Sequence, residues 1–361
     1  MLDTIKIRFR NDCLPGKDYR RPPAGRVGWT TIENDYPERT VLTYQSNARG
    51  NFGAFIRWTP EDDEGLLEFS ARTLLDRYLE GIHSGTIEQA FDRIATEQGA
   101  QFDLDRLAQV GIVLRADAAA GVDVEDKPQT LLGCRARLLW PYKRKDDRFS
   151  ESLLFYNTRE EISIYDKLAE LKAGRKRRID DGRFCLYQYH RAAIENMVRF
   201  EYRAKRKEPI RKAFHAGVVV DQVLKNPASG RRELYHRTKD VTYLGDVLDR
   251  SVQRRALRES WGRLKKRPAG EHDGTQLLAV ARAENWSFGR LRALAGALHL
   301  WELAGRSRDV LADGLGYLPR PTISRALKEI EGAIALLDPA LKKTQGAFEL
   351  FESRLLEELA A

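Results

Sequence analysis

The chain has 361 residues, more than one minimal core requires, and at roughly 150 residues per domain we expect two domains. Hydrophobic residues make up 42% and charged residues 32% of the chain, a balance that excludes an intrinsically disordered protein. The sequence has no apolar run long enough to span a bilayer, and its first residues lack the apolar centre of a signal peptide. We therefore expect a cytoplasmic globular protein with no membrane partner.

The chain is basic, with 62 Lys and Arg against 53 Asp and Glu and a formal net charge of +9. A basic protein attracts polyanions, and each phosphate that it neutralises releases counterions. The charge therefore fits nucleic-acid binding, although many mildly basic proteins bind none. Cys13, Cys134 and Cys185 form no CxxC pair, which argues against a structural zinc site and fits reduced thiols.

Alternating apolar and polar side chains predict strands in the first half of the chain. The first is TIKIRF, residues 4–9, and helical spacing begins at Leu74 and at Thr86. Residues 14–38 are rich in Gly, Pro and charge and are expected to form a loop, while residues 130–139 fit either a strand or a short helix. Further strands are predicted at residues 40–46, 52–58, 66–70, 111–119 and 197–205.

Two short strands, SLLFYN and EISIYDK, flank a polar turn and predict a β-hairpin whose second strand runs into a helix at about Tyr165. After Pro209 the strand patterns nearly vanish and helical patterns take over. We therefore predict an α+β domain in residues 1–215 and a mainly helical C-terminal domain in residues 216–361.

Tyr165 is the first candidate for catalysis because it stands where a strand turns into a helix, in the stretch YDKLAE. A tyrosine hydroxyl has a pKa near 10 and is a poor nucleophile at neutral pH. Attack on a phosphodiester would need a nearby cation such as Lys167, oriented by Glu170, or a metal ion. The alternative is a half-buried tyrosine beside an ordinary surface ion pair.

Acidic residues inside apolar strands form a second candidate site. Glu68 lies in LLEFS, Asp117 in LRADA and Glu201 in VRFEY. A buried acid needs a partner or a metal ion, so these three carboxylates could converge on one Mg²⁺ or Mn²⁺. Strand alternation also places Arg199 on the same face as Glu201, where it could bind phosphate or simply form a salt bridge.

Basic runs flank both motifs, and we expect them to follow a DNA backbone beside the cutting site, although a solvated helix face is the usual reason for such a run. The predicted DNA-binding residues are Arg175, Lys176, Arg199, Arg203, Lys205, Arg206 and Arg325.

Two motifs carry a family resemblance. ISIYDKLAEL fits a Tyr-x-Lys-x-x-Glu pattern, and MVRFEYRAKRKEPIRKAF fits a Val-Arg-Phe-Glu strand followed by a basic stretch. In this order they resemble the filamentous-phage gene II replication protein and its relatives, the phage and plasmid replication protein II/X family. The resemblance runs from the first residues to about residue 335. It implies an HUH-type fold, in which helices cover one face of an antiparallel sheet.

The resemblance also implies a function. A rolling-circle replication initiator of this kind nicks one strand at a phage or plasmid origin, keeps the 5′ end as a phosphotyrosine and later re-ligates it. Tyr165 is the matching nucleophile, with Lys167 beside it and Mg²⁺ or Mn²⁺ as cofactor. The partners would be origin DNA, single-stranded or as a hairpin, and the host helicase and polymerase. The chain lacks the paired histidines of the HUH superfamily, so carboxylates must replace them or His83 or His190 must join them.

The C-terminal stretch LPRPTISRALKEI predicts a helix over residues 318–334 whose apolar side packs on residues 291–301. Its outer side would present Arg325 to DNA in a helix-turn-helix-like arrangement, or the helices would only buttress the sheet. Two other functions remain open: a sequence-specific DNA-binding protein without catalysis, such as a repressor, and a relaxase or transposase with the same chemistry.

Overall fold

A computed structural model gives the fold and describes most of the chain. The described residues are 1–14, 29–36, 39–46, 54–141, 143–146, 151–175, 183–214, 222–225, 232–235, 241–266, 281, 286–304, 307–315 and 319–360. Within them, no helix is both long and apolar enough to cross a membrane.

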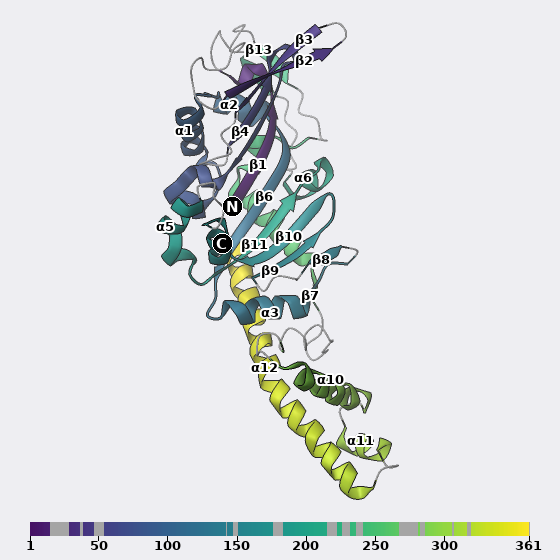
Figure 1. Cartoon of the computed structure of the whole chain (residues 1–361). Helices are drawn as coiled ribbons and strands as arrows, with labels where there is room; N and C mark the ends of the chain where they lie inside the picture. The colour runs from purple at the N-terminus through teal and green to yellow at the C-terminus, as the bar shows by residue number, and fades with distance from the viewer. Residues whose placement is uncertain are drawn as a thin grey trace.

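A ten-stranded antiparallel sheet is the centre of the described structure (Figure 1). In order across the sheet, the strands are β2 (Trp29–Tyr36), β3 (Arg39–Ser46), β4 (Phe55–Thr59), β5 (Glu64–Ser70), β1 (Leu2–Phe9), β6 (Ile112–Asp123), β11 (Met197–Ala204), β10 (Glu160–Asp166), β9 (Ser152–Tyr156) and β8 (Arg144–Asp146). β1 and β6 bring the N-terminal strands beside β11, so residues far apart in sequence meet at the middle of the sheet.

The two faces of the central strands differ in chemistry because side chains alternate along each strand. Side chains such as Ile5, Phe69 and Phe200 lie in the main hydrophobic core on one face. On the other face, Lys6 stands opposite Glu68, and Arg203 stands opposite Asp117. A charged row therefore crosses the sheet behind its apolar core.

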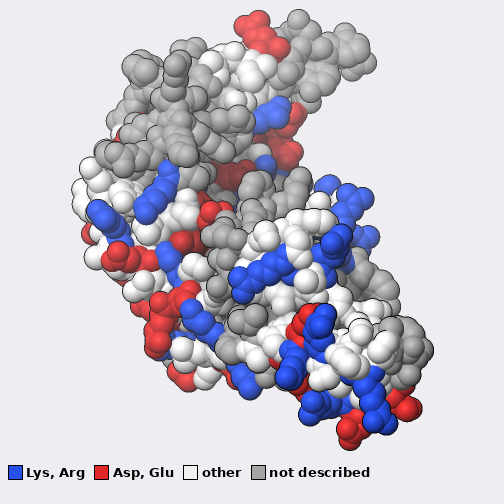
Figure 2. Space-filling model, turned by 60° about the horizontal axis from the view of Figure 1, so that its bottom comes forward, with Lys and Arg blue, Asp and Glu red and all other residues white. Residues whose placement is uncertain are grey.

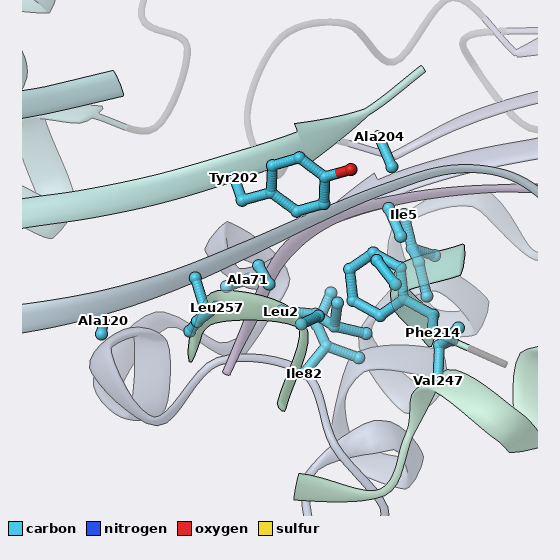
Figure 3. Packing of buried hydrophobic residues seen from close by; sticks show 14 of the residues in the cluster. Leu2, Ile5, Ala71, Ile82, Ala120, Tyr202, Ala204, Phe214, Val247 and Leu257 are labelled. Carbon is cyan, nitrogen blue, oxygen red and sulfur yellow. The ribbon is translucent and has the colours of Figure 1, made fainter. Parts of the chain in front are cut away.

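Helices cover the apolar face. They include α3 (Lys127–Arg137), α6 (Lys207–Phe214), α8 (Arg250–Gly262) and the C-terminal half of α12 (Arg320–Ala360). Tyr202 stacks on Phe214 of α6, and Phe200 meets Trp261 of α8 edge to face. Figure 3 shows Tyr202 of the sheet above Phe214, Ile5 and Leu257 in this core.

Shorter elements close the ends of the sheet and the loops. The helices are η1 (Asn11–Cys13), η2 (Pro60–Asp62), η3 (Ala71–Glu80), α1 (Ile87–Gln98), α2 (Leu104–Val110), α4 (Lys167–Arg175), α5 (Arg183–Ile194) and α7 (Leu244–Val247). The strands β7 (Leu138–Leu139) and β14 (Lys265–Lys266) pair with each other, as do β12 (Gln222–Lys225) and β13 (Arg232–Tyr235).

The last three helices form an arm that extends from the sheet (Figure 1). α10 (Phe288–Leu303) and α11 (Arg308–Gly314) pack on the first half of α12. Leu327 and Ile330 of α12 lie in one small hydrophobic cluster, and Ala333 joins Leu294 and Leu298 of α10 in a second. The arm therefore has its own core, which α12 connects to the core of the sheet.

The structure confirms the predicted α+β class, with the sheet in the N-terminal part and helices in the C-terminal part. The division at residues 215 and 216 stays a prediction. Side chains from beyond it, including Trp261 and Phe351, lie in the same core as the sheet.

Two local predictions need correction, and a third, which left strand and short helix open, is decided by the structure. Residues 29–36 form β2 rather than a loop; Thr30–Glu33 are all exposed, so no apolar alternation marks the strand. Residues 130–139 contain most of a helix, α3, followed by the short strand β7. β12 and β13 lie where only helices were expected, and the predicted loop residues 15–28 lie outside the described residues.

Candidate active site

Tyr165 is the last residue but one of β10, and α4 begins two residues later. Asp166, between them, makes this abrupt change of structure possible. Its carboxylate accepts hydrogen bonds from the backbone N–H groups of Leu168, at 2.8 Å, and Ala169, at 3.1 Å, and thus caps the new helix. Lys127 of α3 holds the same carboxylate at 2.9 Å. The predicted strand-to-helix junction is confirmed.

The Tyr165 hydroxyl donates a 2.8 Å hydrogen bond to Oε2 of Glu201 on the neighbouring strand β11. Both side chains are buried, with exposed fractions of 9% for Tyr165 and 1% for Glu201. Burial and the charge of Glu201 raise the pKa of Tyr165 well above its usual value. The tyrosine is therefore a neutral phenol at neutral pH, already bonded to a carboxylate that can take its proton.

Arginine side chains join the predicted acids into a row across the sheet. The Nε atom of Arg203 donates to Oε1 of Glu201 at 2.6 Å and lies 3.7 Å from Asp117. Arg115 binds Asp117 on one side and reaches Glu68 at 3.5 Å on the other. The guanidinium group of Arg203 thus lies near both Asp117 and Glu201. Glu68 is not near Arg203 in this row; among the described residues it is linked to Asp117 only through Arg115.

Asp117 sits in an environment that disfavours its charge. Burial raises the pKa of its carboxyl to about 7; the bond from Arg115 opposes this increase, and the charge of Glu201 adds to it. The folded protein therefore holds a proton on this residue at pH values where the unfolded chain has lost it.

Asp117 should for this reason make stability depend on pH. The folded pKa lies above the ordinary value of 3.8, so the folded state binds more protons and stability falls as pH rises from about 4 to 7. At most, this one site lowers the free energy of unfolding by about 1.4 kcal/mol per pH unit. We expect Asp117→Asn to flatten this slope, measured by urea unfolding at pH 5 and pH 8. An unchanged slope in the variant would assign the pH dependence to other groups.

Lys167, the first residue of α4, is almost completely buried. Its Nζ donates to Glu170 at 2.6 Å and lies over the rings of Tyr78, at 5.0 Å, and Tyr165, at 5.5 Å. Burial lowers the pKa of Lys167, but the neighbouring Tyr78 and Glu170 outweigh it and raise the pKa overall. Lys167 is thus a fixed positive charge beside the tyrosine ring, oriented by Glu170 as the spacing predicts.

Arg199 is bound inside the protein. It lies directly opposite Tyr165, its exposed fraction is 2%, and it donates to Asp3 at 2.6 Å. Its guanidinium group also lies over the Tyr78 ring at 5.7 Å. In this arrangement the charge of Arg199 is paired with Asp3 inside the protein, and the side chain does not line the cavity. Asp3 and Tyr78 were not singled out in the sequence, and neither carries a local signal that would have marked it.

A cavity of about 910 Å³ opens beside these groups. Tyr165, Lys167, Asp117, Glu201 and Arg203 all line it, together with further charged side chains from β1, η3, β6, β10 and α4. Its other charged or polar lining residues are Asp3, Thr4, Arg72, Tyr78, Arg115, Glu151, Ser152, Glu161, Ser163, Asp166, Glu170 and Lys172. The cavity is large enough for a nucleotide-sized segment of a ligand.

Other predicted site residues lie outside this cavity or beside it. Glu68 binds Lys6 and Arg115 and is not among the lining residues. Lys205 binds Glu161 at the end of the row, and Arg206 is exposed. The side chain of Arg175 and the whole of Lys176 lie outside the described residues.

Neither histidine that was considered as a metal ligand approaches the carboxylates. His83 meets Arg250, and burial together with Arg250 lowers its pKa to about 4. His190 bonds to the backbone oxygen of Leu75 at 2.6 Å.

The three-carboxylate metal site does not form as predicted. In the described part of the chain, no three His, Cys, Asp or Glu side chains are placed to hold a metal ion together. Asp117 and Glu201 nevertheless lie on neighbouring strands, are buried and both line the cavity; burial is the main reason for the raised pKa of Asp117, and the charge of Glu201 adds to it. Carboxylate oxygens are ligands that Mg²⁺ and Mn²⁺ prefer, so these two residues stay the candidate ligands.

The surface of the arm carries the last predicted residue. Arg325 is exposed on α12, and Arg320 and Lys328 are exposed on the same helix. Figure 2 shows the end of the molecule that contains the arm coming forward, with Lys and Arg side chains interspersed with Asp and Glu. The predicted packing of α12 on the preceding helices is confirmed, since Leu327 and Ile330 are buried there.

Comparison with models of protein families found no matching family. Comparisons with curated proteins and with solved structures found no significant match either. The resemblance to the phage and plasmid replication family therefore rests on sequence motifs, of which the strongest lie around Tyr165 and Glu201.

Proposed function

We propose that this protein is a rolling-circle replication initiator, which nicks one DNA strand at a phage or plasmid origin with Tyr165. The observation that carries the proposal is the hydrogen bond from the Tyr165 hydroxyl to buried Glu201, at the wall of a large charged cavity. A nucleophile bonded to its own proton acceptor and open to a cavity is the arrangement that covalent catalysis requires.

The proposed reaction is a transesterification at phosphorus. The Tyr165 oxygen bonds to phosphorus, the bond from phosphorus to the 3′ oxygen breaks, and Glu201 takes the phenol proton. The 3′ oxygen takes a proton from solvent and leaves as a 3′-hydroxyl that can prime a host polymerase, and Glu201 returns its proton to solvent. The 5′ phosphate stays on Tyr165, so one ester replaces another and a later attack by a 3′-hydroxyl can re-ligate the strand without ATP.

Positive charge in the cavity supports this chemistry. Arg203 and Arg115 lie on the cavity wall and are each about one-third exposed, so a DNA phosphate can reach them. Lys167 is fixed beside the Tyr165 ring, where its charge favours the phenolate that forms during attack. These three groups would stabilise the charge that builds up on the phosphoryl oxygens and on the nucleophile.

Asp117 and Glu201 are the residues that would hold Mg²⁺ or Mn²⁺. When bound, such a cation would polarise the scissile phosphate. In the structure Oε2 of Glu201 accepts the hydrogen bond from Tyr165, and Oε1 accepts one from Arg203.

A nicking assay tests the proposed function. The protein is incubated with single-stranded and duplex origin DNA of its own replicon, with Mn²⁺ or Mg²⁺ and with excess EDTA. We expect a cut strand and a protein–DNA adduct only with the cation. Full cleavage in the chelator would rule out the metal, and binding without any cut would favour a repressor or origin-recognition protein instead. A relaxase or transposase would give the same adduct but on the DNA of a different element.

The arm is the proposed reader of duplex origin DNA, because its exposed Arg325 stands on a helix whose opposite side is packed. We expect Arg325→Ala to reduce the preference for origin over random duplex by about 1–3 kcal/mol if the side chain contacts a base. Competition binding at fixed salt measures this preference. Cleavage of a preformed single-stranded site should persist, because Tyr165 lies in the sheet.

Arg93→Ala on α1 is the matched control, since it removes the same charge from a helix at the sheet. Unchanged preference in Arg325→Ala, or an equal loss in Arg93→Ala, would assign origin choice to the sheet domain.

A further inference from the structure

Ser163 occupies a central position in the cavity wall. It lies on β10 between Glu161 and Tyr165. Alternate side chains of a strand point to the same face, so these three residues share the face of the cavity. On the neighbouring strand β11, Ser163 pairs directly with Glu201. Only 8% of its surface is exposed, and it lines the cavity. Sequence patterns do not mark it, because a single serine in an apolar strand carries no motif.

The hydroxyl of Ser163 has no hydrogen-bond partner among the described residues. Most buried hydroxyl groups have one, because an unpaired polar group loses its hydration without compensation. The charged side chains around Ser163 are bonded to one another: Glu201 to Tyr165 and Arg203, and Glu161 to Arg203. A free donor in a wall of paired charges is positioned to bind a ligand in the cavity.

We propose that the Ser163 hydroxyl donates a hydrogen bond to a non-bridging oxygen of the phosphodiester that Tyr165 attacks. Residues two apart on a strand are separated by about 7 Å, so one phosphate group between them can meet both side chains. Arg203 lies on the next strand, lines the same cavity and supplies positive charge to that group. Ser163 is thus a positioning residue that orients the phosphorus toward the tyrosine oxygen.

The inference rests on the proposed function, but its binding step can be tested without cutting. All proteins carry Tyr165→Phe, and the dissociation constant of a single-stranded oligonucleotide is measured for Ser163, Ser163→Ala and Ser163→Thr. A hydrogen bond to a charged oxygen supports an expected loss of about tenfold or more in the alanine variant and recovery with threonine. Ser70→Ala is the matched control, because Ser70 is another buried serine without a partner among the described residues and does not line the cavity.

A second oligonucleotide with neutral methylphosphonate linkages identifies the ligand atom. If Ser163 binds a phosphate oxygen, the proteins with serine and with alanine should have the same dissociation constant for the neutral strand. The neutral linkage has already removed the interaction, so the substitution has nothing further to remove. Thermal unfolding of Ser163→Ala should show the same or higher stability, because an unpaired buried hydroxyl is removed. A loss of binding through misfolding would instead lower the melting temperature.

The outcomes separate the two proposals. If wild-type protein nicks DNA but Ser163→Ala and Ser70→Ala bind the oligonucleotide alike, the role of Ser163 is refuted and the function stands. If the wild type never nicks DNA but Ser163→Ala alone weakens phosphodiester binding, the function fails and the phosphate contact stands. A tenfold loss that persists on the neutral strand refutes the phosphate contact, since Ser163 would then meet a base or sugar.

Discussion

Tyr165→Phe should abolish nicking and adduct formation while the protein still binds single-stranded DNA. The substitution keeps the ring that packs against Lys167 and removes only the oxygen that would attack phosphorus. We expect the rate of strand cleavage to fall by roughly 10⁴-fold or more, as is found when a covalent nucleophile is deleted. Single-turnover cleavage of a labelled origin strand measures this loss.

The variant also loses the hydrogen bond to Glu201, which should lower the free energy of unfolding by about 1–3 kcal/mol. Arg203 still holds Glu201, so the site should keep its structure, and circular dichroism would verify folding.

Tyr156→Phe is the matched control for the nucleophile. Tyr156 ends the partner strand β9, where it pairs with Glu161, and it does not line the cavity. We expect this variant to cut normally. The opposite pattern, in which Tyr165→Phe still forms an adduct and Tyr156→Phe does not, would show that the nucleophile has been assigned to the wrong strand.

Glu201→Gln should have the second largest effect, because glutamine keeps the shape of the side chain but cannot take the proton from Tyr165. Loss of a general base lowers rates by about 10²–10⁴-fold. The amide also places a donor toward either Tyr165 or Arg203, both of which are donors in the wild type. We therefore expect a slow enzyme with reduced stability and, if Glu201 holds the cation, a weaker response to Mn²⁺.

Glu161→Gln separates the two proposed roles of Glu201, which are to accept the proton of Tyr165 and to hold Arg203. Glu161 also binds Arg203 from within the buried row, but it does not contact the Tyr165 hydroxyl. Its loss should disturb Arg203 and leave proton transfer intact, so the rate should fall less than in Glu201→Gln. Equal rates for the two variants would indicate that Glu201 acts only by holding Arg203.

Much of the central sheet could be predicted from the sequence because its strands carry regular alternation. β1, β5, β10 and β11 all lie where alternating side chains placed them, and the junction after Tyr165 followed from a strand pattern that meets a helical one. The acids Asp117 and Glu201 were selected for the same reason, since a charge in an apolar strand stands out. Both lie in the cavity wall.

The pairing of charges could not be predicted, because it depends on which strands become neighbours. β1 inserts between β5 and β6, and this order brings Asp3 to Arg199 and puts Arg115 between Glu68 and Asp117. For this reason Arg199 was predicted to bind DNA, whereas the structure shows that it is buried. The strand β2 was not predicted for a different reason. It has no buried face in the residues whose exposure is described, so no sequence pattern distinguishes it from a loop.

The length of α12 was also missed. The expected helix ended near residue 334, but the observed helix continues to Ala360 and its last turns enter the core of the sheet. Its apolar residues serve two different clusters along its length, so no single stripe describes them. Tertiary packing at both ends, and not local pattern alone, sets the extent of this helix.

The most direct test of the central claim is mass spectrometry of the protein–DNA adduct. Wild-type protein is allowed to cut origin DNA, the adduct is digested with nuclease and protease, and the modified peptide is sequenced. The proposed mechanism predicts a nucleotide joined through its 5′ phosphate to the oxygen of Tyr165. A nucleotide on any other residue, or cut DNA with a free 5′ phosphate and no adduct, would contradict it.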